Sequence, residues 1–216
     1  MEGYSSEREQ VEVIQKWWKE HGKSILLGLT VGLLGLGGYR YWDETRTLQA
    51  ESASINYEKF LTQADNKTSK ESRATGQAIL DNYPASIYAR MTALTLAKLA
   101  IDDGQPEEAK KRLQWVLDHP GQDKLAEAAR ARLAQLSLAD GKADAAWALL
   151  VKGGLDKGDQ LAELKGDILA AQGKTAEAVV LYAKAQKLLT EGGGNPAIIE
   201  LKLERLGQLG QVGMQE

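Results

Sequence analysis

Few residues in this chain have the types and spacing that chemistry requires. The two histidines, His21 and His119, each lack a second metal ligand at the short spacing that zinc sites use. Cysteine is absent, which excludes thiolate metal sites and disulfides. The carboxylate pairs at 102–103 and 107–108 stand at predicted helix ends, where acidic residues favour a helix N-terminus or a solvated turn. We therefore predict no catalytic residue, no metal, no cofactor and no enzyme.

The glycine-rich stretches do not fit phosphate binding. Residues 35–38 lie within an apolar block, and residues 192–194 lack the Lys-Ser/Thr that completes a phosphate-binding loop. The net charge is −3, and no basic stripe is clustered along the chain. Nucleic-acid binders normally show such a stripe, so we expect no nucleic-acid partner.

The elements that organise the chain begin with the apolar block, Ser24–Tyr39, which holds sixteen residues without a charge. Extended to Trp42 it would rise about 28 Å as a helix, close to the thickness of a bilayer core. Tyr39, Tyr41 and Trp42 suit a membrane interface at its end. We predict a transmembrane helix over residues 24–42 in contact with membrane lipid, a tail over residues 1–23 and a soluble domain over residues 43–216.

The block fits two other interpretations less well. A buried helix of a soluble core would carry five glycines, each costing about 1 kcal/mol relative to alanine. A cleavable signal peptide would end in small residues, whereas this block ends in Tyr-Arg-Tyr-Trp. Lysines 16, 19 and 23 precede the block, and fewer basic residues follow it, which favours a cytoplasmic N-terminus. In a bacterium, residues 43–216 would then be periplasmic, anchored in the inner membrane by a single span.

A stripe of small residues runs along one face of this predicted helix. Its members are Ser24, Gly28, Gly32 and Gly35, at spacings of four, four and three. Small residues at such spacing let a second helix approach closely within lipid. We therefore interpret the stripe as a helix-packing face, although glycine-rich spans are common and the spacing could be accidental.

After the apolar block, three segments share a pattern aligned on Gly104, Gly141 and Gly173. A small residue lies seven positions before each glycine, an alanine five positions after it, and a large apolar residue four positions further on. The periods are 37 and 32 residues, on either side of the tetratricopeptide period of 34. The glycine suits the turn between two helices, and the small residues suit the place where the helices cross. Asn195-Pro196 predicts the start of a final helix.

We therefore predict an all-α, tetratricopeptide-like array of helical hairpins, without a sheet. Arrays of this kind bind other proteins on a concave surface built mainly from the first helix of each pair. The tetratricopeptide pattern places on that surface Met91, Leu94, Lys98, Ala128, Ala131, Gln135, Glu163 and Asp167. This set is apolar at one end and acidic at the other and lacks a basic clamp, so extended apolar segments are its expected ligands. The match to the consensus is partial, and some of these residues could instead face neighbouring helices.

The N-terminal residues resemble the YfgM family, ancillary subunits of the bacterial SecYEG translocon. The resemblance is carried by Glu9-Gln10-Val11-Glu12, Trp17-Trp18, His21-Gly22-Lys23, the glycine-rich span and Tyr39-Arg40-Tyr41-Trp42. It implies partnership with the translocon and with the periplasmic chaperone PpiD, and a role in passing translocating polypeptides to periplasmic chaperones. Two alternatives stay open: a membrane-tethered scaffold for an envelope complex, and a regulator that acts through its cytoplasmic tail.

Overall fold

The structure is a computed structural model that describes residues 4–65, 69–119, 121 and 123–212. These residues form α-helices joined by turns and loops, with no strand among them. In chain order the helices are α1 (Tyr4–Asp65), α2 (Ser69–Asn82), α3 (Ile87–Asp102), α4 (Pro106–Asp118), α5 (Asp123–Ala139), α6 (Ala143–Lys152), α7 (Ala162–Ala171), α8 (Thr175–Glu191) and α9 (Ala197–Val212). The predicted all-α fold is therefore confirmed.

The chain divides into two compact units, residues 1–52 and residues 53–216. Helix α1 contributes to both, and the predicted boundaries after residues 23 and 42 fall inside it without a break. Within the first unit, Gln15–Arg40 is long and apolar enough to cross a membrane by length and composition. The second unit contains the repeats.

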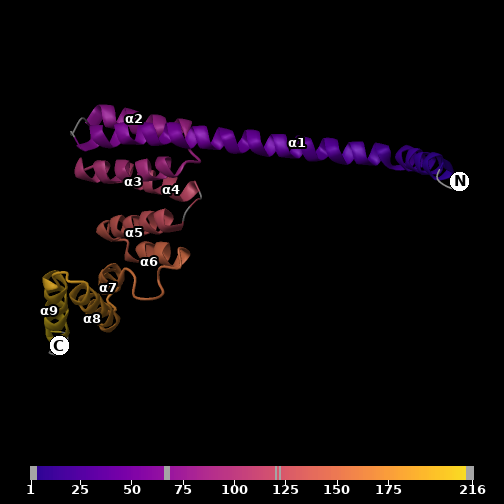
Figure 1. The fold of residues 1–216 in the computed structure, drawn as a ribbon. Helices are drawn as coiled ribbons and strands as arrows, with labels where there is room; N and C mark the ends of the chain where they lie inside the picture. Colours follow the sequence, from indigo (N-terminus) through magenta and orange to yellow (C-terminus); the bar gives the residue numbers. More distant parts are fainter. Residues whose placement is uncertain (1–3, 66–68, 120, 122, 213–216) are drawn as a thin grey trace. The chain divides into compact units, whose positions relative to one another are not determined.

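The second unit is a series of helical hairpins (Figure 1). Its closest pairs are α3 with α4, α5 with α6, and α7 with α8, and each pair also contacts the next. The last turns of α1 and helix α2 precede them, and α9 packs on α8. The ring of Phe60, fully buried, lies 3.0 Å from where a Cβ on Gly76 would stand, so the opening hairpin packs closely.

The three repeat glycines occupy the turns that the sequence predicts. Gly104, Gly141 and Gly173 have φ angles of 69°, 76° and 76°, the left-handed region that glycine adopts without a Cβ penalty. After each one, the next amide donates to a carbonyl five residues earlier, for example Lys174 N to Leu169 O at 2.9 Å. These bonds are those of a Schellman helix end, so each first helix stops where its glycine stands.

The small residues of the pattern lie where the paired helices meet. Alanines 109, 146 and 178 are each 0% exposed, and the large residues Leu113, Leu150 and Tyr182 are at most 3% exposed. The size of the large residue matches the size of the small residue that it faces. The repeats with Leu113 and Leu150 have an alanine seven residues before the glycine, whereas the repeat with the larger Tyr182 has Gly166 there. The bulkier ring occupies the space that a Cβ at residue 166 would need.

Candidate protein-binding surface

Two neighbouring pockets lie along the first helices of the hairpins, α3, α5 and α7. Both are lined by Gln135 of α5, so they share one wall. We call them the cationic pocket and the acidic pocket after the charged side chains that line them. First helices are where a helical-hairpin array presents its binding surface.

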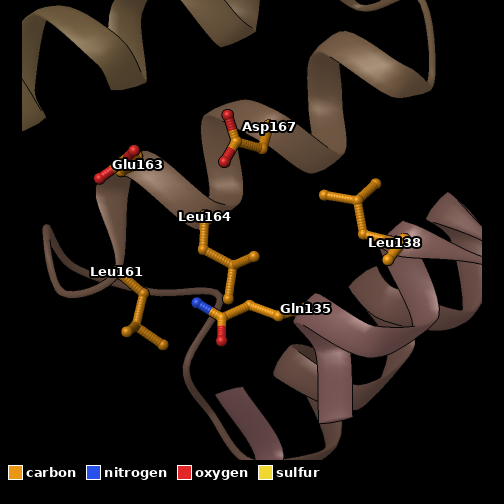
Figure 2. A pocket seen from close by; sticks show the side chains of 7 residues that line it. Gln135, Leu138, Leu161, Glu163, Leu164 and Asp167 are labelled. Atoms are coloured by element: carbon orange, nitrogen blue, oxygen red, sulfur yellow. The ribbon is translucent and has the colours of Figure 1, made fainter. Parts of the chain in front are cut away.

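The acidic pocket lies between α5 and α7 and has a volume of about 510 Å³. Figure 2 shows Gln135 and Leu164 extending toward one another from the two helices, with Glu163 at the start of α7 and Asp167 about one turn after it. The residues that line it are Gln135, Leu138, Ala139, Leu161, Glu163, Leu164 and Asp167. Leucine side chains and two carboxylates therefore share one hollow.

The two carboxylates of the acidic pocket form ion pairs with a lysine of the same chain. Lys202 of α9 places its Nζ 2.7 Å from Glu163 Oε1, and 2.7 and 2.9 Å from the two carboxylate oxygens of Asp167. The hydroxyl of Tyr182 donates to Asp167 Oδ1 at 2.7 Å. Burial lowers the pKa of Lys202, but its hydrogen bonds to Asp167 and Glu163 outweigh burial and raise it. Lys202 is therefore charged at neutral pH and offsets one of the two negative charges of this pocket.

A buried lysine fixes the loop that borders the acidic pocket. Lys165 is only 1% exposed, and its Nζ donates to the carbonyl oxygen of Gly158 at 2.7 Å, with longer bonds to Asp156 and Lys157. Burial lowers the pKa of Lys165. The loop ends at Leu161, which has a left-handed φ of 56° just before α7. The hydrogen bonds from Lys165 to these carbonyl oxygens therefore fix the loop that places Leu161 in the pocket wall.

The cationic pocket lies between α3, α4 and α5 and has a volume of about 260 Å³. Its lining residues are Ala97, Lys98, Ile101, Leu113, Arg132, Gln135 and Leu136. Lys98 and Arg132 are exposed, and neither has an ion pair within the described part of the chain. The polar contact of Arg132 is a long bond of 3.4 Å to the carbonyl oxygen of Leu94. Both cations are thus free to meet an anionic group.

The predicted surface residues divide between these pockets and the packed interior. Lys98, Gln135, Glu163 and Asp167 line the pockets. Met91, Ala128 and Ala131 are half-buried and line neither pocket. Leu94, by contrast, belongs to the buried core and is 9% exposed. The predicted surface position of Leu94 is wrong because the tetratricopeptide pattern has each first helix exposed on one face, whereas α3 is covered on both sides by α2, α4 and α5.

Both histidines stack on a neighbouring tryptophan ring. His119 stacks on Trp115 with ring centroids 3.8 Å apart, and His21 stacks on Trp17 at 5.5 Å. Over the residues that the structure describes, no group of three His, Cys, Asp or Glu side chains could hold a metal ion.

Comparison with known proteins places this architecture in a family. The model of the tetratricopeptide repeat-like domain matches residues 15–208. The chain belongs to this family. Because the match begins at residue 15, it includes the apolar stretch of α1 as well as the hairpins.

Proteins named ancillary SecYEG translocon subunit are similar over most of their length. The protein from Neisseria gonorrhoeae is 28% identical over 95% of this chain and 100% of its own. The Escherichia coli protein is 29% identical over 80% of this chain and 84% of its own length. The Haemophilus influenzae protein is 28% identical over 85% of this chain and 91% of its own length. The resemblance to the YfgM family is thus confirmed. No solved structure matches the chain.

The shared apolar stretch presents the small-residue stripe without obstruction. Ser24, Gly28, Gly32 and Gly35 are exposed, and a Cβ at each of the three glycines would meet nothing within 4 Å. Tyr39 is 63% exposed, while the side chains of Tyr41 and Trp42 lie outside the part of the chain that the structure describes. The stripe is therefore open to a neighbouring helix.

Arg132 and Lys202 are the charged residues that sequence reasoning missed. Arg132 follows Ala128 by four residues and precedes Gln135 by three, so helical spacing alone could have placed it on the predicted face. Lys202 stands 35 and 39 residues from its two partners on a helix outside the repeat pattern, and no local signal identifies it.

Proposed function

We propose that this protein is a non-enzymatic accessory of the Sec translocon, anchored in the bacterial inner membrane by residues 24–42. The observation that carries the proposal is the joint match of apolar helix and repeats to proteins named ancillary SecYEG translocon subunit. A translocon subunit of this kind needs both a span that reaches the translocon within the bilayer and a domain that meets polypeptide outside it.

In this proposal the N-terminus is cytoplasmic and residues 43–216 are periplasmic. The excess of lysine before the span supports that orientation. The stripe Ser24–Gly28–Gly32–Gly35 docks against a translocon helix or an anchor helix of a PpiD-type chaperone, since open small-residue faces allow close backbone approach. The surrounding lipid contacts the exposed leucines of the same helix.

The repeat domain then contacts translocating polypeptides or the partner chaperone through the two pockets on α3, α5 and α7. Their leucine walls and open charged rims suit side chains of an extended segment. In this role the protein holds emerging chains near the membrane and passes them to periplasmic chaperones. Binding of this kind requires no catalytic group.

The test is site-specific photo-crosslinking of the full chain in native inner membranes. A photoreactive residue at Gly32 is expected to capture a SecYEG subunit or PpiD, and one at Gln135 a secreted chain arrested during translocation. Matched probes at Gly37, on the opposite helix face, and at Lys174 at the start of α8 serve as controls. Absence of translocon, PpiD and secreted chains from both the Gly32 and the Gln135 products would refute the proposal.

A further inference from the structure

We infer that the cationic pocket recognises a carboxylate flanked by aliphatic side chains in a bound polypeptide. This inference rests on the proposed function and specifies the chemistry of the segment that the repeat domain contacts. It rests on two features of the pocket, its apolar walls and its two cations without ion pairs.

The apolar walls of the cationic pocket favour an apolar side chain in the bound polypeptide. Ile101, which is 41% exposed, and the half-buried Leu136 line the pocket over the buried Ala97 and Leu113, so an aliphatic side chain that packs on Ile101 and Leu136 would remove apolar surface from water on both partners. The volume of about 260 Å³ is below the roughly 300–1,000 Å³ typical of small-molecule sites. One or two side chains of a polypeptide fit this space better than a whole small ligand.

The two cations of this pocket favour an anionic group in the same polypeptide segment. Lys98 from α3 and Arg132 from α5 line one pocket, and neither has an ion pair among the described residues. Their like charges gain from an anion shared between them, and an arginine fork matches carboxylate geometry. Phosphate groups of a nucleic acid would leave the apolar walls unsatisfied, and the chain as a whole is net negative at −3.

The neighbouring acidic pocket does not reverse this preference. Glu163 and Asp167 would attract a cationic segment, but Lys202 already donates to both at 2.7 Å. A segment that continues past Gln135, the residue shared by both pockets, therefore meets leucine walls beside two carboxylates, of which Lys202 neutralises one. The sequence favoured by the surface is aliphatic, acidic, aliphatic.

The experiment uses the purified full chain in mild detergent and four labelled peptides that differ only in their central three residues. The peptides are capped at both ends and carry Leu-Glu-Leu, Leu-Gln-Leu, Leu-Lys-Leu or Ser-Glu-Ser at the centre. Dissociation constants come from fluorescence anisotropy at low and high salt. Each exposed ion pair contributes at most about a fivefold gain in affinity. We expect Leu-Glu-Leu to bind about three- to tenfold more tightly than Leu-Gln-Leu, with the preference reduced by salt.

Two double variants assign the preference to the pocket. Lys98→Gln with Arg132→Gln is expected to abolish the preference for glutamate, so that Leu-Glu-Leu and Leu-Gln-Leu bind the variant equally. Lys152→Gln with Lys174→Gln, which removes two exposed cations that line neither pocket, is expected to retain it. Circular dichroism melting verifies that both variants are folded.

Three outcomes would overturn the inference. The first is equal binding of Leu-Glu-Leu and Leu-Gln-Leu, or a preference that survives the first double variant. The second is binding of Ser-Glu-Ser as tight as that of Leu-Glu-Leu. The third is no binding of any peptide, which would also remove polypeptide contact from the proposed function but leave span docking, tested by crosslinking at Gly32, untouched.

Discussion

The ring of Tyr182 lies 2.7 Å from the point that a Cβ on Gly166 would occupy, so α7 and α8 approach one another through a glycine. Real Cβ atoms do not tolerate that separation. The same ring holds its hydroxyl 2.7 Å from Asp167, which fixes its position and leaves it little room to move aside. Close helix packing and the pocket charge network are therefore joined at one tyrosine.

We expect Gly166→Ala to lower the free energy of unfolding by about 1–3 kcal/mol, because the added methyl overpacks a buried contact. Urea titration of the full chain, followed by circular dichroism, measures the change. Gly207→Ala is the control, since a Cβ at residue 207 of α9 meets nothing within 4 Å. It is expected to stabilise by up to about 1 kcal/mol. Equal effects of the two changes would contradict the close approach.

Gly173→Ala is expected to destabilise by about 1–2 kcal/mol, because an alanine would adopt a left-handed φ of 76° only with strain. No neighbouring atom lies within 4 Å of the added Cβ, so the cost is conformational. Gly173→Asn should cost less, since asparagine tolerates this region better. If asparagine proved as costly as alanine in thermal unfolding, the left-handed turn would not be the cause.

Lys202→Met removes the cation that Glu163 and Asp167 share. We expect a loss of about 1 kcal/mol, small because all three side chains retain contact with water. Hydrogen exchange should accelerate in α9 while α3 keeps its protection. Lys187→Met, at a lysine that is 75% exposed, is the matched control and should leave exchange unchanged. Unchanged exchange in α9 of the Lys202→Met variant would show that the ion pairs do not hold this helix.

Asp140 links two repeats through a hydrogen bond of 2.6 Å from Lys110 of α4. This hydrogen bond lowers the pKa of Asp140 below its usual value of 3.8. The stabilisation is therefore fully present above about pH 4 and is lost as pH falls through the lowered pKa. Asp140→Asn is expected to reduce the melting temperature at pH 7 and to have little effect near pH 2.

A double-variant cycle with Lys110→Gln tests whether the pair itself is responsible. In the Lys110→Gln background, Asp140→Asn should change the melting temperature at pH 7 much less. A full effect without the lysine would assign the pH dependence to another partner.

In the membrane-spanning stretch, Gly32→Leu is expected to reduce co-purification of SecYEG or PpiD from mild detergent. A leucine there blocks close approach of another helix without disturbing this chain, because the space around residue 32 is open. Gly37→Leu adds the same side chain on the opposite face and should retain the partners. Equal retention of every partner by both variants would remove the packing role of the stripe.

The repeat architecture could be predicted because its signals are local. Gly104, Gly141 and Gly173 end helices through contacts within five residues, and helical spacing alone brings small and large residues onto the faces that pair. The apolar stretch of α1 could also be predicted from the sequence, because length and composition decide whether a helix can cross a bilayer.

The charge pattern of the binding surface was decided only by tertiary structure. Lys202 meets Asp167 across 35 residues because α9 packs on α8, and Arg132 shares a pocket with Lys98 because α5 packs beside α3. Charges counted along the first helices alone predict an acidic end and no basic clamp, because that count leaves out the partner charges on other helices. Ion pairs depend on distances of a few ångströms between segments far apart in the chain, and no periodicity encodes those distances.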